Sequence, residues 1–234
     1  MMSNTISTTK NTLYISKSLL NINTTKTNIV SNENELTIDS YKAWNLDRSG
    51  LSEAAFKNAI KGYNYLNKAH LIYKKNIVSI VDFSKPSTDK RLFIVDVRTG
   101  KVLYNTWVAH GKNSGNEYAD HFSNLPESHQ SSLGFFITMN TYMGGNGYSL
   151  KLNGCEKGIN DKAYERAIVI HGAAYASDQF INSRGLLGRS YGCPAIPTQL
   201  SRQIIDVIKN GSCLYLYHPT KDYYTHSKIL NSQS

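Results

Sequence analysis

The sequence of 234 residues is poor in cysteine: it has only Cys155, Cys193 and Cys213, and no CxxC pair. Three thiols cannot all pair with one another, and their spacing fits no common zinc site. The sequence therefore argues against a disulfide framework and a structural metal, and we expect the protein to use no cofactor. At least one thiol is left for another role.

The sequence also lacks an apolar run long enough to cross a bilayer, so we expect no integral membrane segment. The apolar residues 13–15 and 19–20 are separated by Ser-Lys-Ser, and no signal-peptide core is visible. There is no Lys/Arg-rich arm and no aromatic RNA-binding motif, which argues against a nucleic-acid partner. The glycines in 142–147 are followed by neither GK[ST] nor a helix pattern, which argues against a phosphate loop.

A positive charge remains to be explained. The formal net charge is +9, and residues 1–50 hold five Lys/Arg and four Asp/Glu, which leaves +8 on the remainder. A basic surface favours an anionic partner such as nucleic acid, a membrane surface or a polyanionic cell wall. The charge is equally compatible with an ordinary domain of high isoelectric point.

The length allows one sizeable core. Residues 1–48 are rich in Asn, Thr and Ser without apolar periodicity, and we predict a disordered or loosely attached leader there. A wrapping strand or two around 36–38 is the alternative. We assign the folded domain to 49–220 and expect the polar tail, 221–234, to be frayed.

Within the domain, apolar spacing predicts a helix over 51–67, capped by Ser49 or Ser52, and another over 197–210. Strands are predicted at 77–83, 91–97, 102–108, 134–138, 167–171 and 212–217, and a further strand after the glycine loop within 142–152. Residues 98–101 (RTGK) read as a hairpin turn, and 110–132 as a long loop. We infer a mainly β fold, an antiparallel open barrel or sandwich with two or three peripheral helices.

Cys193 lies between Gly192 and Pro194, and His171 ends the apolar run 167–171. An imidazole that removes the thiol proton makes cysteine a strong nucleophile, so we predict a Cys193–His171 pair. The alternatives are a buried structural thiol and a histidine that only makes structural hydrogen bonds. Cys213, in an apolar strand pattern, is interpreted as a buried inert thiol, and Cys155 is not assigned.

Neighbouring residues suggest the rest of a site. The backbone N–H groups of Gly192 and Cys193 are candidate oxyanion donors, because a tight turn there would leave them unpaired. Ser190 either orients these groups or caps the turn. Arg189 either holds a substrate carboxylate or faces solvent. Two tyrosines either line a groove or pack: Tyr175 and Tyr191.

These motifs resemble the catalytic domain family of murein L,D-transpeptidases, in its divergent YkuD-type branch. The resemblance covers about residues 50–218 and rests on 110–115 (HGKNSG), 122–124 (FSN), 131–136 (SSLGFF), 170–173 (IHGA) and 188–195 (GRSYGCPA). Ser190 and Gly192 match the better-studied branch. Tyr191 replaces a second histidine, Pro194-Ala195 follows the cysteine, and 18 residues separate His171 from Ser190.

The resemblance implies a mainly β catalytic domain with a cysteine nucleophile. It also implies that a backbone carbonyl near Gly172 orients His171, and that His110 and Ser114 flank the site. The implied substrate is the stem peptide of bacterial peptidoglycan, which places the protein in the periplasm or at the cell surface. Cys193 would attack the carbonyl of the third stem residue, release terminal D-alanine and form a thioester.

An amine of a second stem would then give a 3–3 cross-link, or water would make the protein an L,D-carboxypeptidase. A hypothesis of another class is a non-catalytic cell-wall-binding module that uses the basic surface. A general cysteine peptidase is less well supported, because no protease-type cysteine signature is present. The sequence does not indicate an oligomeric state.

Overall fold

The protein is described from a computed structural model that covers residues 36–232. Most of the predicted leader, residues 1–35, lies outside the described residues. Residues 36–48 belong to the folded unit: α1 (Ser40–Ala43) and the 3₁₀ helix η1 (Leu46–Ser49) bury Tyr41 and Leu46. The Tyr41 hydroxyl donates to Leu51 O at 2.7 Å. The domain therefore begins earlier than predicted, and residues 36–39 form coil and turn rather than a strand.

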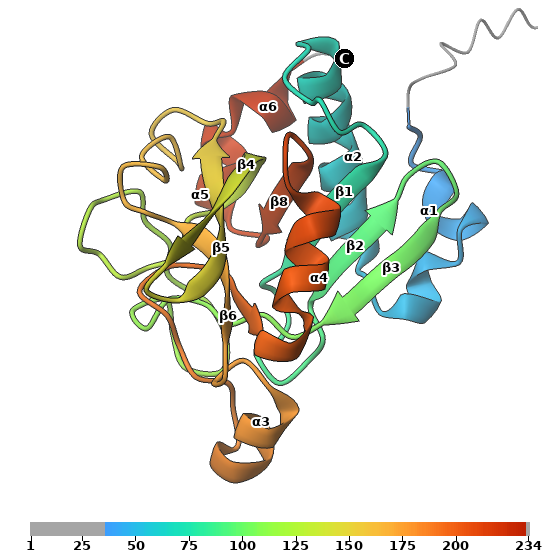
Figure 1. Ribbon diagram of the computed structural model, residues 1–234. Coiled ribbons are helices and arrows are strands. Elements are labelled where there is room, and N and C mark those ends of the chain that lie inside the picture. The colour runs from blue at the N-terminus through green and yellow to red at the C-terminus, as the bar shows by residue number, and fades with distance from the viewer. Residues whose placement is uncertain (1–35, 233–234) are drawn as a thin grey trace, which may run out of the picture. The chain divides into compact units, whose positions relative to one another are not determined.

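One eight-stranded sheet forms the framework, in the order β3-β2-β1-β8-β4-β5-β6-β7 (Figure 1). The strands are β1 (Ile77–Asp82), β2 (Leu92–Asp96), β3 (Lys101–Thr106), β4 (Gly134–Gly144), β5 (Gly147–Gly154), β6 (Val169–Ala173), β7 (Ala195–Pro197) and β8 (Cys213–Tyr217). The pairs β1–β8 and β6–β7 are parallel, and the other pairs are antiparallel. The predicted mainly β fold is confirmed, as a mixed sheet.

Two edges of this sheet approach each other. After β3, Ala109 and Gly111 form isolated bridges to Ala195 and Ser190, next to the edge strand β7. The segment that follows one edge therefore runs along the other edge and nearly closes the sheet into a barrel. The β2–β3 hairpin turns where predicted, with Gly100 at φ +72°. The predicted glycine loop is shorter than expected, because β4 extends six residues beyond the predicted strand end at 138 and pairs with β5 in a second hairpin.

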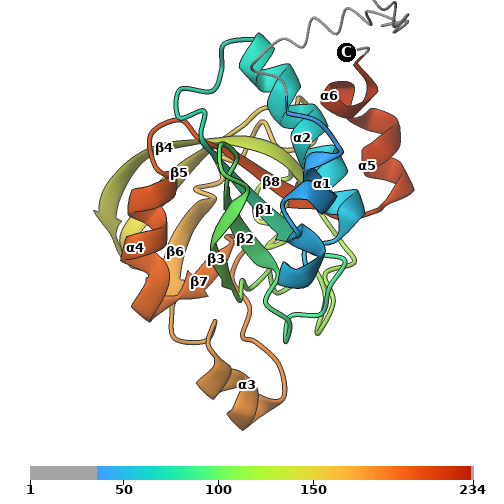
Figure 2. The same cartoon turned by 90° about the vertical axis from the view of Figure 1, so that its right-hand side faces the viewer.

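Two long helices flank the strands, as predicted. They are α2 (Glu53–Lys68), capped by the Ser52 hydroxyl, and α4 (Thr198–Ile208). Figure 2 shows α4 on one side of the strands and α1, α2, α5 and α6 on the other. The short helix α3 (Asp178–Arg184) lies in the connection between β6 and β7, where no helix was expected. No helix in residues 36–232 is long and apolar enough to span a membrane.

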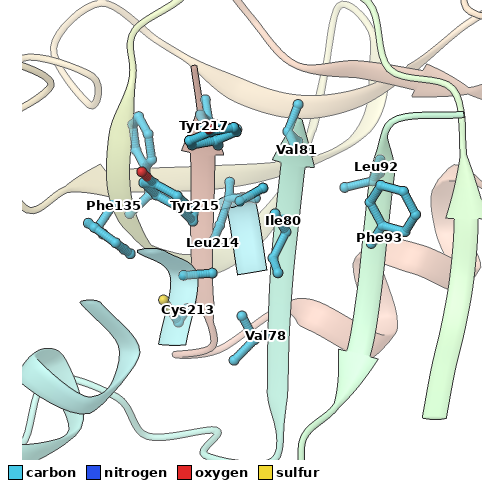
Figure 3. Close-up of a cluster of buried hydrophobic side chains, with 14 of the residues drawn as sticks. Val78, Ile80, Val81, Leu92, Phe93, Phe135, Cys213, Leu214, Tyr215 and Tyr217 are labelled. Atoms are coloured by element: carbon cyan, nitrogen blue, oxygen red, sulfur yellow. The ribbon is translucent and has the colours of Figure 1, made fainter. Parts of the chain in front are cut away.

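The main core lies where β1, β2, β4 and β8 meet (Figure 3). Every residue of β1 and β8 is buried, because helices cover both faces at the centre of the sheet. The rings of Phe135 and Tyr215 stack with centroids 4.2 Å apart. Gly62 of α2 faces Phe135 so closely that a β-carbon there would overlap the ring, which is why this position needs glycine. Cys213 is fully buried in this core, as predicted.

The C-terminal tail is folded, contrary to the prediction of a frayed polar segment. Residues 221–231 form α5 (Lys221–His226) and α6 (Lys228–Asn231), which bury Tyr223, Ile229 and Leu230. The buried carboxylate of Glu156 holds this segment: it accepts from Phe135 N of β4 at 2.9 Å, from Tyr223 OH at 3.0 Å and from the Ser227 hydroxyl. Residues 221–231 have no apolar periodicity strong enough to predict these buried contacts.

We expect Ile229→Ala to lower the free energy of unfolding by about 2–4 kcal/mol, because it removes a buried side chain and leaves a cavity. The exposed neighbour provides the control, and Lys228→Ala should change stability by less than about 0.5 kcal/mol. Urea unfolding followed by circular dichroism measures both. Equal stability of the two variants would contradict the packing of Ile229 and the C-terminal helices against the rest of the domain.

Candidate active site

The loop that carries Cys193 is a tight turn held by a serine. Ser190 Oγ accepts from Gly192 N at 3.1 Å and donates to Cys193 O at 2.6 Å. Gly192 adopts φ +117°, and a β-carbon there would lie 2.8 Å from Gln130 O, so only glycine fits. Of the two readings of Ser190, the structure favours the one in which it closes the turn.

This turn corrects the predicted oxyanion hole. The N–H of Gly192 is already paired with Ser190, so it is not free to bind an oxyanion. The N–H of Cys193 makes no hydrogen bond within residues 36–232. Of the two predicted backbone donors, the N–H of Cys193 is therefore the one that remains available.

His171 reaches the same region through strand pairing. It lies on β6 and pairs with Ala195 of β7, two residues after Cys193. Its Nδ1 is 3.0 Å from Gly172 O; since a carbonyl only accepts, Nδ1 carries the proton and Nε2 offers a lone pair. Burial lowers the pKa of His171, which keeps the imidazole neutral at pH 7. A neutral imidazole with a free Nε2 is the form that can accept a proton.

The Cys193 sulfur is half-buried and faces the backbone before β6. Sγ lies 3.5 Å from Val169 N and 3.7 Å from Ala167 O, and no hydrogen bond joins it to His171 in the described chain. Burial raises the pKa of the Cys193 thiol, while the Val169 N–H and the Arg166 charge oppose that rise. The thiol is thus protonated at neutral pH and needs a base before it can attack.

Arg166 was not found from the sequence. Its guanidinium donates to Ser123 O at 2.6 Å, to Ser132 Oγ at 2.7 Å and to Gln130 O at 2.8 Å. Gln130 O is the same carbonyl that faces Gly192, so Arg166 supports the cysteine turn and places its charge beside it. The available signal was the serine-rich stretch 123–132, which offers many acceptors. Nothing local connects that stretch to an arginine 34 to 43 residues later.

The segment 109–115 lies behind the cysteine turn and is bonded to it along its length. Ala109 N donates to Ala195 O at 2.8 Å, Ser190 N to His110 O at 2.9 Å, and Lys112 N to Ser190 O at 2.8 Å. The hydroxyl of Ser131 adds a bridge, because it accepts from Gly111 N at 3.0 Å and lies 3.2 Å from Gly192 O.

His110 and Ser114 were expected to flank the site, and the structure buries both side chains in this support. Ser114 Oγ accepts from Ser131 N at 2.9 Å. His110 Nδ1 accepts from the buried guanidinium of Arg91 at 2.7 Å, and its Nε2 lies 3.2 Å from Gly115 O. Neither side chain has a surface for a substrate, since they are 1% and 0% exposed. They position the cysteine turn from behind.

The remaining predicted residues surround the turn. Arg189 is exposed and donates to Gly115 O at 3.3 Å and to Asn116 Oδ1. Tyr191 is also exposed, with its ring 4.7 Å from that of His129 and Lys112 Nζ 4.4 Å from its centroid. Both side chains thus remain accessible beside the turn.

Two further predicted residues lie deeper. Burial and the nearby Cys193 raise the pKa of Tyr175 to about 12, and Tyr175 O accepts from Gly188 N at 2.9 Å. Gly172 packs against α4, where a β-carbon would lie 2.7 Å from Ser201 Oγ. Gly172 thus contributes its carbonyl and its lack of a side chain. In residues 36–232, no three His, Cys, Asp or Glu side chains are grouped to hold a metal.

Residues 47–217 match the profile of the L,D-transpeptidase catalytic domain. No curated protein matches the chain. Among solved structures, the chain is similar to the helical cell shape determining protein Pgp2 (K307A mutant) of Campylobacter jejuni, at 16% identity and a TM-score of 0.41, over 69% of this chain and 57% of that one.

Two further solved structures are L,D-transpeptidases. The one from Mycobacterium smegmatis is 12% identical, with a TM-score of 0.38, over 61% of this chain and 59% of that chain. The one from Xylanimonas cellulosilytica is 15% identical, with a TM-score of 0.35, over 61% and 60%. The chain thus spans about three fifths of the length of the structures it resembles.

The neutral state of His110 makes stability depend on pH. Burial, together with the charge of Arg91, lowers the pKa of His110 to about 4. The unfolded chain binds a proton at His110 more readily than the folded chain does. The part of the free energy of unfolding that depends on neutral His110 is therefore complete above about pH 6.5 and is lost as pH falls toward 4. We expect that loss to be at most about 3 kcal/mol, and His110→Asn should show a shallower dependence. Urea midpoints from pH 7.5 to 4.5 test this; parallel curves for the two proteins would contradict it.

The charge of Arg166 should assist ionisation of the thiol. We expect Arg166→Met to move the pH midpoint of Cys193 alkylation by iodoacetamide upward, because the thiolate loses a nearby cation. Arg166→Lys keeps the charge and should stay closer to the parent. Mass spectrometry of the Cys193 peptide gives the rate at each pH. A midpoint unchanged by Arg166→Met would show that Arg166 acts on the loop alone.

Proposed function

Because the chain belongs to the L,D-transpeptidase catalytic domain family, we propose that it is a cysteine acyltransferase that acts on peptidoglycan stem peptides through Cys193 and His171. One observation carries this proposal. The pairing of β6 with β7 brings His171 alongside the cysteine turn, with Nδ1 fixed by Gly172 O and Nε2 left as a base. Two side chains 22 residues apart in sequence thereby form a candidate pair of nucleophile and base.

The reaction begins with a proton transfer. The Cys193 side chain turns from Ala167 O toward His171, and Nε2 takes the thiol proton, giving a thiolate and an imidazolium. The thiolate adds to the carbonyl of the third residue of a tetrapeptide stem. The N–H of Cys193 donates to the developing oxyanion, and Arg166 lowers the energy of negative charge nearby.

Collapse of this intermediate breaks the peptide bond to the terminal D-alanine. The imidazolium returns its proton to the leaving amine, and the peptide remains as a thioester on Cys193. In the second half, neutral His171 takes a proton from the attacking group, and the thiol leaves with that proton. An amine of another stem yields a 3–3 cross-link, whereas water yields a tripeptide, so the same residues serve transpeptidase and L,D-carboxypeptidase reactions.

The substrate also suggests where the protein works. Peptidoglycan stems lie outside the cytoplasmic membrane, so we place the protein in the periplasm or at the cell surface of a bacterium. The excess of basic residues, with a net charge of +9, favours association with anionic wall polymers. Arg189 and Tyr191 are accessible beside the turn and are the side chains we assign to contact the stem.

We expect Cys193→Ala to abolish conversion of tetrapeptide stems, a loss of at least about 10³-fold, and His171→Gln to cost about 10²–10⁴-fold. Cys155→Ser, at the other half-buried free thiol, should keep activity. Liquid chromatography of digested muropeptides measures the products, and mass spectrometry measures the acyl adduct. Cross-linked dimers indicate transfer and tripeptides alone indicate hydrolysis. Wall binding without turnover or adduct would point to a non-catalytic module instead.

A further inference from the structure

A hollow of about 300 Å³ lies along the segment of chain that faces the sulfur of Cys193. Its lining includes Ala167 and Val169, and these two residues also contact Sγ through Ala167 O at 3.7 Å and Val169 N at 3.5 Å. A group attached to the sulfur therefore has the hollow as its neighbour. The lining also includes two tyrosines and one lysine, Tyr142, Tyr164 and Lys151.

Strand register places the lysine on the catalytic face of the sheet. Lys151 of β5 is directly opposite Val169 of β6, and Ser149 is opposite His171. Residues opposite each other in an antiparallel pair, and residues two apart in one strand, point to the same face. Lys151 and His171 therefore share that face, with one residue pair between them along the strands.

The ammonium group of Lys151 is held by aromatic rings. Its Nζ lies 5.4 Å from the ring centroid of Tyr142 and 5.6 Å from that of Tyr164. Both rings favour a cation near their faces and limit the movement of the side chain. Within residues 36–232, no carboxylate forms a salt bridge with Lys151. Its positive charge is thus available to a ligand in the hollow.

We propose that this hollow binds the side-chain carboxylate of the residue whose carbonyl reacts with Cys193. Lys151 pairs with the carboxylate, and the faces of Tyr142 and Tyr164 contact the aliphatic part of the same side chain. An ammonium-ended side chain would meet the like charge of Lys151. The site thus selects acyl donors whose third residue carries a free carboxylate over donors in which that group is amidated. The inference rests on the proposed function, since it specifies which stems that reaction accepts.

The experiment compares two synthetic tetrapeptide stems that differ only in this group, one with a free carboxylate and one with the carboxamide. We expect the parent protein to favour the carboxylate stem by about tenfold in kcat/KM, the ratio that about 1.4 kcal/mol produces. Lys151→Met should bring the ratio close to one, and Lys151→Arg, which keeps the charge, should retain a preference. Lys61→Met, at an exposed position on α2, is the matched control and should keep the parent ratio.

The outcomes separate the two proposals. Turnover of both stems at equal rates by the parent, or a preference unchanged by Lys151→Met, overturns the carboxylate site and leaves the proposed function standing. Absence of turnover and of a Cys193 adduct with either stem overturns the proposed function and this inference with it. Thermal unfolding of each variant confirms that a changed ratio comes from folded protein.

Discussion

The buried guanidinium of Arg91 fixes the geometry on which the candidate site depends. It lies next to β2, is 0% exposed, and donates to Val108 O, Lys85 O and His110 Nδ1. An arginine without a carboxylate partner is costly to bury unless carbonyl and imidazole acceptors surround it. Burial lowers the pKa of Arg91 to about 9, which still leaves it charged at neutral pH. It can therefore hold His110 in one tautomer and one position.

Backbone hydrogen bonds connect the segment around His110 to the loop that carries Cys193. The chain on either side of His110 is paired with Ser190 and Ala195, and Ser190 in turn closes the turn around Cys193. A second support is Arg166, which donates to carbonyls of the serine-rich stretch 123–132, including Gln130 O next to Gly192. The cysteine turn is thus supported by two arginines, and neither forms a hydrogen bond with the sulfur within residues 36–232. Precise placement of a catalytic group by surrounding rigid contacts is what a reaction of this kind requires.

Local patterns in the sequence were sufficient for much of the architecture. The periodicity of 51–67 and the alternation around the RTGK turn predicted α2 and the β2–β3 hairpin, because such elements form from neighbouring residues. The motifs around His171 and Cys193 pointed to the family that the domain match shows. The family resemblance implied that a backbone carbonyl near Gly172 orients the histidine, and the structure has that contact.

What the sequence could not supply depends on distant contacts. Arg166 and Arg91 acquire their roles from carbonyls that only the folded chain brings together. His110 and Ser114 carry motif-like spacing, but only the folded chain supplies the contacts with Arg91 and Ser131 that bury them. The short helices α5 and α6 are too brief to show periodicity, and a buried Glu156 stabilises them from 67 to 71 residues away. The N–H of Gly192, which was expected to be free, instead donates to the hydroxyl of Ser190.

The position of β8 has a consequence for how the chain folds. β8 lies between β1 and β4, yet it is the last strand to leave the ribosome. Until residues 213–217 are available, β1–β3 and β4–β7 each have an unpaired edge where β8 belongs. The long-range pairing of Val78 with Cys213 must therefore await nearly complete synthesis. His171 and the turn of Cys193 both belong to the β4–β7 part of the sheet. β8 therefore joins that part to β1–β3 late in folding, although it carries neither the thiol nor the imidazole.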